Sequence, residues 1–354
     1  MAHQELVQPR PTKPWTPSPL QRFIDVLVVV VSVIAAYSFV AITPLKGKLA
    51  YAGMTFVFYL VIATLYRGIT SGSASVKNTV VQGFFTAAML IALMPIVSII
   101  FTVVHKGAKG LSLSLFTHDM SMATPTDPLS SGGLLHAITG TLTLVIVSLI
   151  LSVPIGILTA LYLTEIKGSL TRPIRFLVQA MSGVPSIVAG LFILSAVLYP
   201  ITKQYSGFMG SLALTILMIP TIARTSEEVL KLIPNDLREA GVALGGTQWR
   251  TVAMIVLPAA RSGLVTAMIL GIARIAGETA PLLLLTGGGD RVNPNPFSGP
   301  MGSLPYYIWK SFNAGSPEAV TRAWAGLLVL LLIVFVLFTT ARFVLNRNTN
   351  GKRA

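Results

Sequence analysis

The sequence predicts an all-α, polytopic transmembrane helical bundle, and two observations lead to that class. Of 354 residues, 53% are hydrophobic and only 11% are charged, which is too little polar surface to cover a water-soluble globule of this length. The apolar residues are also grouped into separate runs of about 17 to 27 residues, and about 20 are enough to cross 30 Å of hydrocarbon as a helix.

Taken in order, the chain begins with residues 1–23, where five prolines prevent a continuous helix, so we expect a disordered cytoplasmic tail. Residues 24–79 are expected to form an N-terminal transmembrane helix pair, whose first span is too long for a cleaved signal peptide. Residues 80–345 hold the remaining six spans, and residues 346–354 are a cytoplasmic C-terminal tail. The eight expected spans are 24–43, 49–66, 80–104, 137–163, 178–199, 207–223, 262–285 and 323–344.

The net charge of +14 lies mainly in the short connections between the apolar runs. This placement indicates topology determinants beside anionic lipid, not a nucleic-acid surface. With eight spans and the N-terminus inside, most Lys and Arg fall on the inner side, so we expect a multi-pass protein of the cell membrane with both termini in the cytoplasm. No cysteine is present, which excludes disulfides, thiolate metal sites and cysteine nucleophiles.

The inner connection at residues 224–261 is polar and has a helical pattern. Thr225 to Glu228 have capping-box spacing, which predicts a helix that ends before Pro234. A second helix should begin at Asn235 or Asp236 and end at Gly245 and Gly246, and Thr247 should cap a third helix that runs to Pro258. The apolar stripe of the second helix is formed by Leu237, Ala240, Gly241 and Leu244; by itself it fits an interfacial helix as well as a docking element.

The residue string in this connection favours docking. Glu239-Ala240-Gly241, three residues, Gly245, nine residues and Ile255-Val256-Leu257-Pro258 resemble the EAA loop of bacterial ABC-importer permeases, with Gly241 in place of the usual alanine. That resemblance implies a six-span permease core and a coupling helix that docks into a separate ATPase subunit. It implies that the ATPase-coupling residues are Glu239, Ala240, Gly241, Leu244, Gly245, Ile255, Leu257 and Pro258. No Gly-x-x-x-x-Gly-Lys-Ser/Thr motif occurs in the sequence, so ATP hydrolysis is expected on a partner chain and this chain is not expected to be an enzyme.

A charged pair lies within the apolar run 262–285. An arginine at membrane depth costs about 2.5–3.5 kcal/mol on insertion scales, so Arg274 needs a partner or a water-lined cavity. In a continuous helix Glu278, four residues on, would lie on the same face and pair with it. The pair is either a packing device or a pathway site, in which the guanidinium suits an oxyanion and Arg274, Glu278 and Thr279 line the path.

The string from Arg274 to Leu283, followed by Asn295-Pro296-Phe297 and Ser303-Leu304-Pro305, resembles the phosphate-specific ABC transporter permeases of the PstA type. The resemblance covers roughly residues 80–344, so the first two spans are an extra N-terminal hairpin. It implies import of inorganic phosphate without a cofactor in this chain. The implied partners are a second, PstC-like permease subunit as heterodimer, two PstB-like ATPase subunits and an extracytoplasmic PstS-like phosphate-binding protein.

Three alternatives remain at this point. A permease for sulfate, molybdate or phosphonate would share the coupling loop. An ion-coupled secondary transporter would use membrane charges in a similar way but needs no docking loop. A polytopic membrane enzyme is the least favoured, because no nucleophile–base pair or metal-ligand spacing is apparent.

Overall fold

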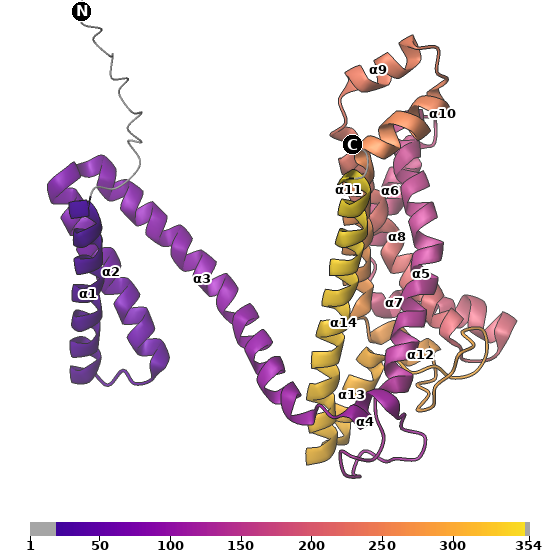
Figure 1. Ribbon diagram of the computed structural model, residues 1–354, viewed down its shortest axis with the longest axis horizontal. Helices are drawn as coiled ribbons and strands as arrows, with labels where there is room; N and C mark the ends of the chain where they lie inside the picture. The colour runs from indigo at the N-terminus through magenta and orange to yellow at the C-terminus, as the bar shows by residue number, and fades with distance from the viewer. Residues whose placement is uncertain (1–18, 351–354) are drawn as a thin grey trace, which may run out of the picture. The chain divides into compact units, whose positions relative to one another are not determined.

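The computed structural model describes residues 19–350, which are folded into helices joined by turns and two longer connections (Figure 1). Residues 1–18 and 351–354, which include most of the expected N-terminal tail and the end of the expected C-terminal tail, lie outside the described residues. Between residues 19 and 350 the β structure is limited to one isolated bridge, Gly287 with Met301. The all-α class is therefore confirmed. The elements are α1 (Pro19–Ile42), α2 (Lys48–Ser71), α3 (Ser73–Gly107), the 3₁₀ turn η1 (Ala108–Gly110), α4 (Leu113–Thr117), α5 (Leu135–Leu161), the π-helix η2 (Tyr162–Ile166), α6 (Thr171–Ser182), α7 (Ser186–Ile193), the π-helix η3 (Leu194–Thr202), α8 (Gly207–Lys231), α9 (Asn235–Ala243), α10 (Gln248–Thr251), the π-helix η4 (Val252–Val256), α11 (Leu257–Ala276), α12 (Ala280–Leu285), α13 (Leu304–Ala314) and α14 (Pro317–Asn350).

Within the described residues, seven helices are long and apolar enough to cross a membrane. The helix pair Thr171–Ser182 and Ser186–Thr202 makes an eighth crossing if it is counted as one, but it is bent by 106°. We expected one span at 178–199, and the structure has a sharply bent helix pair there that begins earlier, at Thr171. Pro185 explains the bend, because it has no N–H to donate and pushes Val184 out of the helical region of backbone space.

The first compact unit of the chain ends at Ile99 and contains α1, α2 and most of α3. Helix α1 buries Val28, Ser32, Ala36 and Val40, which recur every fourth residue along one face and pack it against α2. Helix α3 is continuous from Ser73 to Gly107 and so runs through the expected boundary at 79/80.

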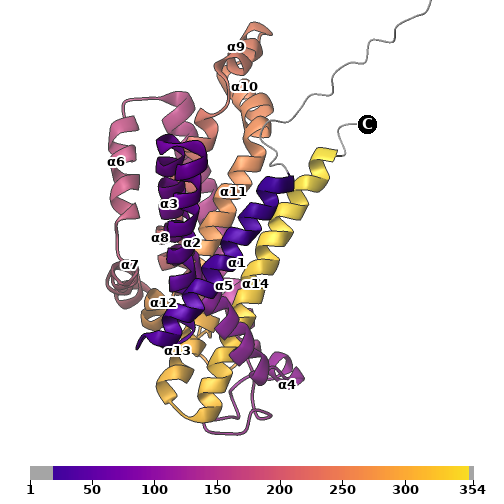
Figure 2. The same cartoon turned by 90° about the vertical axis from the view of Figure 1, so that its left-hand side faces the viewer.

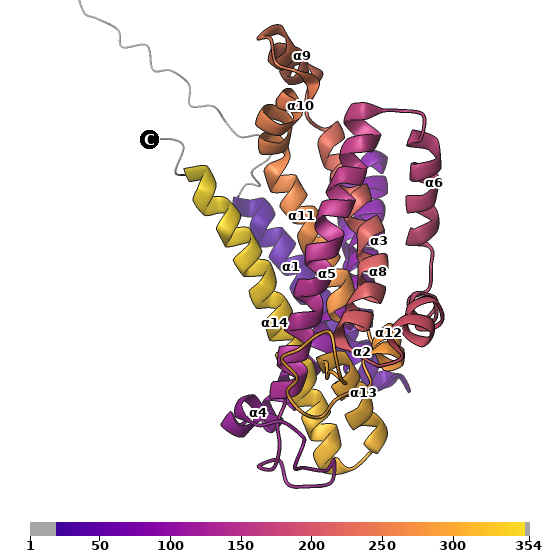
Figure 3. The ribbon, with the colours of Figure 1, turned by 90° about the vertical axis from the view of Figure 1, so that its right-hand side faces the viewer.

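The second compact unit, from Ile100 onward, is built around α5 and α8, the helices that pack most extensively against each other. Small residues permit this approach: a Cβ on Gly156 would lie 2.7 Å from Ile222 Cγ2. In the apolar core between them, Ser148 Oγ donates a hydrogen bond to the carbonyl of Ser211 at 3.1 Å. Figures 2 and 3 show α5, α8 and α11 running alongside one another, with α9 and α10 at one end and α4 and α13 at the other.

The end of this unit that carries α4 and α13 is organised by a buried arginine. Arg322 of α14 is 1% exposed, and its guanidinium donates to the carbonyls of Thr124, Pro125, Pro128 and Ser131 at 2.6–3.3 Å. Asp119 holds the same connection from its other side, because its carboxylate accepts from the Ser121 side chain and from the main-chain N–H groups of Ser121 and Val292. These hydrogen bonds lower the pKa of Asp119. The irregular connection from 118 to 134 is thus fixed by charge-assisted hydrogen bonds.

We predict that Arg322→Met lowers the free energy of unfolding by about 1–3 kcal/mol, since four main-chain carbonyls lose the buried guanidinium that donates to them. Thermal unfolding of the purified protein in detergent measures the loss. The matched control is Arg342→Met in the same helix, where the arginine is exposed. Equal melting temperatures for Arg322→Met and wild type would contradict the assignment.

Candidate functional site

The connection between α8 and α11 forms an arm at one end of the second unit (Figure 1). Helix α8 continues to Lys231, so the helix start predicted at Thr225 was wrong. Ser226 and Glu227, the two residues between the capping positions, are buried within α8, where α6 packs against it. Packing between helices therefore overrides the local capping signal.

The arm itself follows the predicted pattern of helix, glycine turn and helix. Helix α9 begins at Asn235 and ends at Ala243, and Gly245 follows with a φ of 81°, a left-handed conformation that favours glycine. The side chain of Thr247 caps α10 by accepting a hydrogen bond from Arg250 N. These three expectations are confirmed.

Gly241 is the one residue of the predicted apolar stripe that is buried. A Cβ there would lie 2.6 Å from Thr251 Cγ2 and 2.7 Å from Ile255 Cδ1, so the alanine usual at this position would collide with α10 and η4. Leu237 and Leu244, at 41% and 88% exposure, instead face away from the chain. The stripe is therefore not an internal packing face, and most of it is presented to the surroundings.

The remaining residues of the predicted coupling set fall into two groups. Glu239, Ala240 and Gly245 are exposed on the arm, whereas Ile255 and Leu257 are half-buried at its base. Leu257 packs against the apolar cluster that contains Leu161 and Leu230.

We expected a separate helix that ends at Pro258, and this was wrong, because the chain stays helical from Gln248 to Ala276. Pro258 has no N–H for the carbonyl of Met254, and the chain accommodates it with the π-helix η4 directly before it. The base of the arm is thus continuous with the helix α11.

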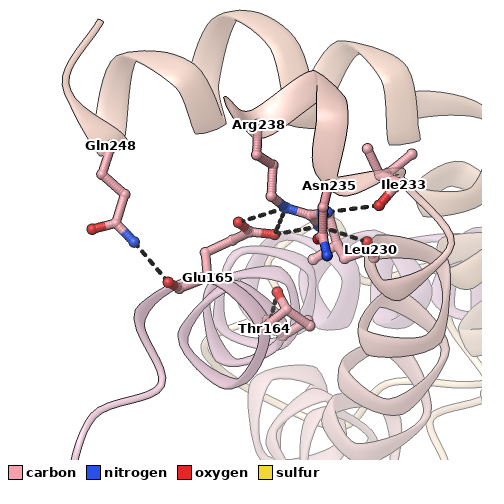
Figure 4. Close-up of polar contacts among 8 residues, drawn as sticks. Thr164, Glu165, Leu230, Ile233, Asn235, Arg238 and Gln248 are labelled. Atoms are coloured by element: carbon pink, nitrogen blue, oxygen red, sulfur yellow. Dashed lines mark hydrogen bonds and ion pairs between the residues drawn. The ribbon is translucent and has the colours of Figure 1, made fainter. Parts of the chain in front are cut away.

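A polar network ties the arm to the end of α5 (Figure 4). Arg238 of α9 donates from Nε and Nη2 to the carboxylate of Glu165, with distances of 2.9–3.2 Å. The same guanidinium donates to the carbonyls of Leu230 and Ile233, at 2.9 and 2.6 Å. From α10, Gln248 Nε2 donates to the main-chain carbonyl of Glu165 at 2.7 Å.

A second group of charges lies where α6 meets the end of α8. Glu227 is 7% exposed in its side chain and pairs with Arg175 at 2.9 Å and with Lys231 at 3.1 Å. Together with Glu165 and Arg238, Arg175 and Lys231 line a cavity of about 930 Å³ below the arm. The carboxylates neutralise part of this basic lining.

The other predicted site, around Arg274, has a different geometry from the expected one. Helix α11 ends at Ala276, Gly277 is its C-cap, and α12 begins only at Ala280 with Pro281 in its first turn. Arg274 in the last turn of α11 is exposed, Glu278 and Thr279 are partly buried in the break, and neither charge belongs to an ion pair within the described residues. The helical pairing of Arg274 with Glu278 was therefore wrong, because the glycine and proline interrupt the helix.

The residues that sequence reasoning missed are Glu165, Arg175, Glu227 and the role of Arg238. Their partners lie 52 and 73 positions apart, which no local pattern reveals. The one available signal was the isolated acidic Glu165 at the end of a long apolar run, since such a charge needs a partner. Within the part of the chain that the structure describes, no group of three His, Asp or Glu could hold a metal ion.

Residues 152–350 match the model of the family described as the binding-protein-dependent transport system inner membrane component. The chain is 38% identical over 277 residues to the phosphate transport system permease protein PstA 1 of Mycobacterium tuberculosis (strain CDC 1551 / Oshkosh), covering 77% of this chain and 90% of that protein. It is 39% identical over 283 residues to PstA of Mycobacterium leprae, covering 78% and 92%. For PstA of Pasteurella multocida the values are 40% over 268 residues, 75% and 93%.

Among solved structures, an inward-facing form of the MetNI methionine ABC transporter aligns with a TM-score of 0.50 and 20% identity, covering 61% of this chain and 94% of that chain. This likeness supports the fold alone. The relatives and the family model agree on a membrane-embedded transport subunit, which is not itself an enzyme. The chain therefore belongs to the binding-protein-dependent transport permeases and, within them, to the PstA family of ABC-importer membrane subunits.

Proposed function

We propose that this chain is the membrane permease subunit of an ATP-driven importer for inorganic phosphate. The observation that carries the proposal is its identity of 38–40% to PstA permeases over three quarters of its length. The arm formed by α9 and α10 supports the coupling part of the proposal, because it presents exposed apolar side chains at the end of the helical bundle.

We propose the exposed face of α9 as the contact for a separate ATPase. Leu237, Ala240 and Leu244 lie there without partners inside the chain to bury them, and Glu239 and Gly245 adjoin them. Gly241, Ile255, Leu257 and Pro258 hold the arm in place from its base. An apolar face next to a charged residue is typical of a helix that docks in a protein groove.

The proposed assembly contains a second permease subunit of the PstC type, two ATPase subunits and an extracytoplasmic phosphate-binding protein. The arm then lies on the cytoplasmic side of the cell membrane. With the bent pair α6 and α7–η3 counted as one crossing, the eight crossings put both ends of the chain on the same side. The excess of Lys and Arg in the inner connections supports the cytoplasmic side.

We propose that phosphate passes the break between α11 and α12. Interrupted helices in transporters commonly line the substrate path, because their main-chain groups are not used up by helical hydrogen bonds. Arg274 is exposed in the single chain and has no carboxylate partner among the described residues, so its planar fork is available to an oxyanion. Glu278 and Thr279 lie in the break beside it and limit how tightly an anion is held.

Replacing Arg274 with alanine is expected to lower phosphate uptake at least about tenfold, since charge-assisted hydrogen bonds to the anion are lost. Arg274→Lys keeps the charge but not the fork, so we expect an intermediate rate. The measurement is labelled-phosphate uptake in cells that lack the native chain, with sulfate, molybdate and phosphonate as competitors. Arg261→Ala, an exposed arginine at the other end of α11, serves as control. Normal uptake by Arg274→Ala would refute the pathway, and competition by another anion would refute phosphate selectivity.

Gly245 gives a separate test of the arm. Nothing lies within 4 Å of a Cβ built there, so a substitution acts through the backbone and not through a collision. A side chain at positive φ costs about 1–2 kcal/mol, with asparagine tolerated best and β-branched residues worst. We therefore expect Gly245→Val to impair uptake and co-purification of the ATPase much more than Gly245→Asn. Equal effects of the two variants would mean that the turn conformation is not what matters.

A further inference from the structure

The arm is weakly packed against the helices that it would have to move. Backbone packing of α9 is with α10 and η4, that is, with other parts of the same connection. Below it lies the cavity of about 930 Å³, open between α9 and the ends of α5 and α8. Force between protein elements travels through close-packed contacts or stiff hydrogen-bonded groups, and a hollow supplies no packed contacts. One packed route from α9 to α5 runs through η4, whose Val252 and Val256 share an apolar cluster with Leu161. Across the cavity itself, a displacement of α9 reaches α5 only through side-chain connections.

Glu165 and Arg238 make such a connection at the edge of the cavity (Figure 4). The carboxylate accepts from both Nε and Nη2 of Arg238, and the side chains are only 7% and 22% exposed. A bidentate pair of this kind fixes orientation as well as distance. It differs from the Lys231–Glu228 pair, whose carboxylate side chain is 72% exposed and which lies within one helix.

Arg238 and Glu165 also form hydrogen bonds with other parts of the connection between α8 and α11. Arg238 Nη1 and Nη2 reach the carbonyls of Ile233 and Leu230, which lie beyond and at the end of α8. Gln248 of α10 bonds the Glu165 carbonyl, so both helices of the arm are attached to one residue of η2. The π-helix η2 ends at Ile166, and Lys167 follows with a φ of 52°, so the chain turns away directly after Glu165. The π-helix η2 follows α5 without a break, and we call the two together the α5–η2 rod. The Glu165 carboxylate lies in the last turn of this rod.

We propose that the Glu165–Arg238 ion pair is the rigid link through which movement of α9 reaches α5. The proposal rests on the proposed function, since it names positioning residues for the coupling of the ATPase to transport. Arg238 does not touch the ATPase or the substrate in this account; it acts by holding α9 at a fixed angle to the α5–η2 rod. Lysine would not replace it, because a point charge cannot bond the carboxylate and two carbonyls in one plane.

A cross-linking rescue tests the link in the assembled importer, purified with its partner subunits and reconstituted in proteoliposomes. The chain has no cysteine of its own, so a Glu165→Cys, Arg238→Cys double variant offers a unique thiol pair within it. We expect uptake of the double variant to fall at least about fivefold, the scale on which coupling networks respond to mutation. Treatment with a short bis-maleimide should restore most of it, because a covalent bridge replaces the ion pair. The two single-cysteine variants, treated in the same way, should show no recovery.

An assembled, cross-linked double variant that stays inactive would overturn the proposal, since the contact would then have to open during transport. Wild-type uptake by the untreated double variant would overturn it as well. If the double variant fails to assemble, Glu165→Gln decides: it keeps the shape but not the charge, and uptake equal to that of the control Glu228→Gln refutes the link. Absence of phosphate uptake by the wild-type assembly would count against the proposed function itself and not against the link.

Discussion

Lipid hydrocarbon offers main-chain N–H and C=O groups no hydrogen-bond partner, and this constraint governs every part of the chain that crosses the membrane. It makes the helix the default, and it makes each departure from a helix informative. The departures in the second unit are the bend at Pro185, the break at Gly277–Thr279 and three π-helices. Two π-helices, η2 and η4, lie at the base of the arm, and the break lies beside Arg274. Irregular backbone therefore occurs where we place coupling and passage.

The arm shows how a small element can be both exposed and mechanically connected. Gly241 lets α9 lie close to Thr251 and Ile255, which leaves the larger apolar residues of the stripe facing outward. The arm is attached to α11 directly, because the chain is one continuous helix from Gln248 to Ala276. The Glu165–Arg238 pair adds a second attachment, to α5. Because α5 and α8 are the most closely packed helices of the unit, a displacement passed to α5 involves its core.

Much of this architecture was predictable from the sequence because the decisive signals are local. Long apolar runs, the glycine pair after α9 and the cap at Thr247 each act within a few residues, and the structure contains the corresponding spans and turns. Errors arose where distant packing, or a neighbouring glycine and proline, overrode a local signal. The capping-box spacing at Thr225 was overridden by burial of Ser226 and Glu227, and the i, i+4 relation of Arg274 and Glu278 was broken by Gly277 and Pro281. The Glu165–Arg238 pair joins residues 73 positions apart, and no local pattern identifies Arg238 as the partner of Glu165.

We propose that this chain imports phosphate with the energy of ATP, through an arm that docks on a separate ATPase. The most direct measurement is accumulation of labelled phosphate in proteoliposomes that contain the complex purified through this chain, with the energy source varied. We expect accumulation that requires ATP and the phosphate-binding protein and that persists when ion gradients are dissipated. Accumulation driven by an ion gradient without ATP would contradict it.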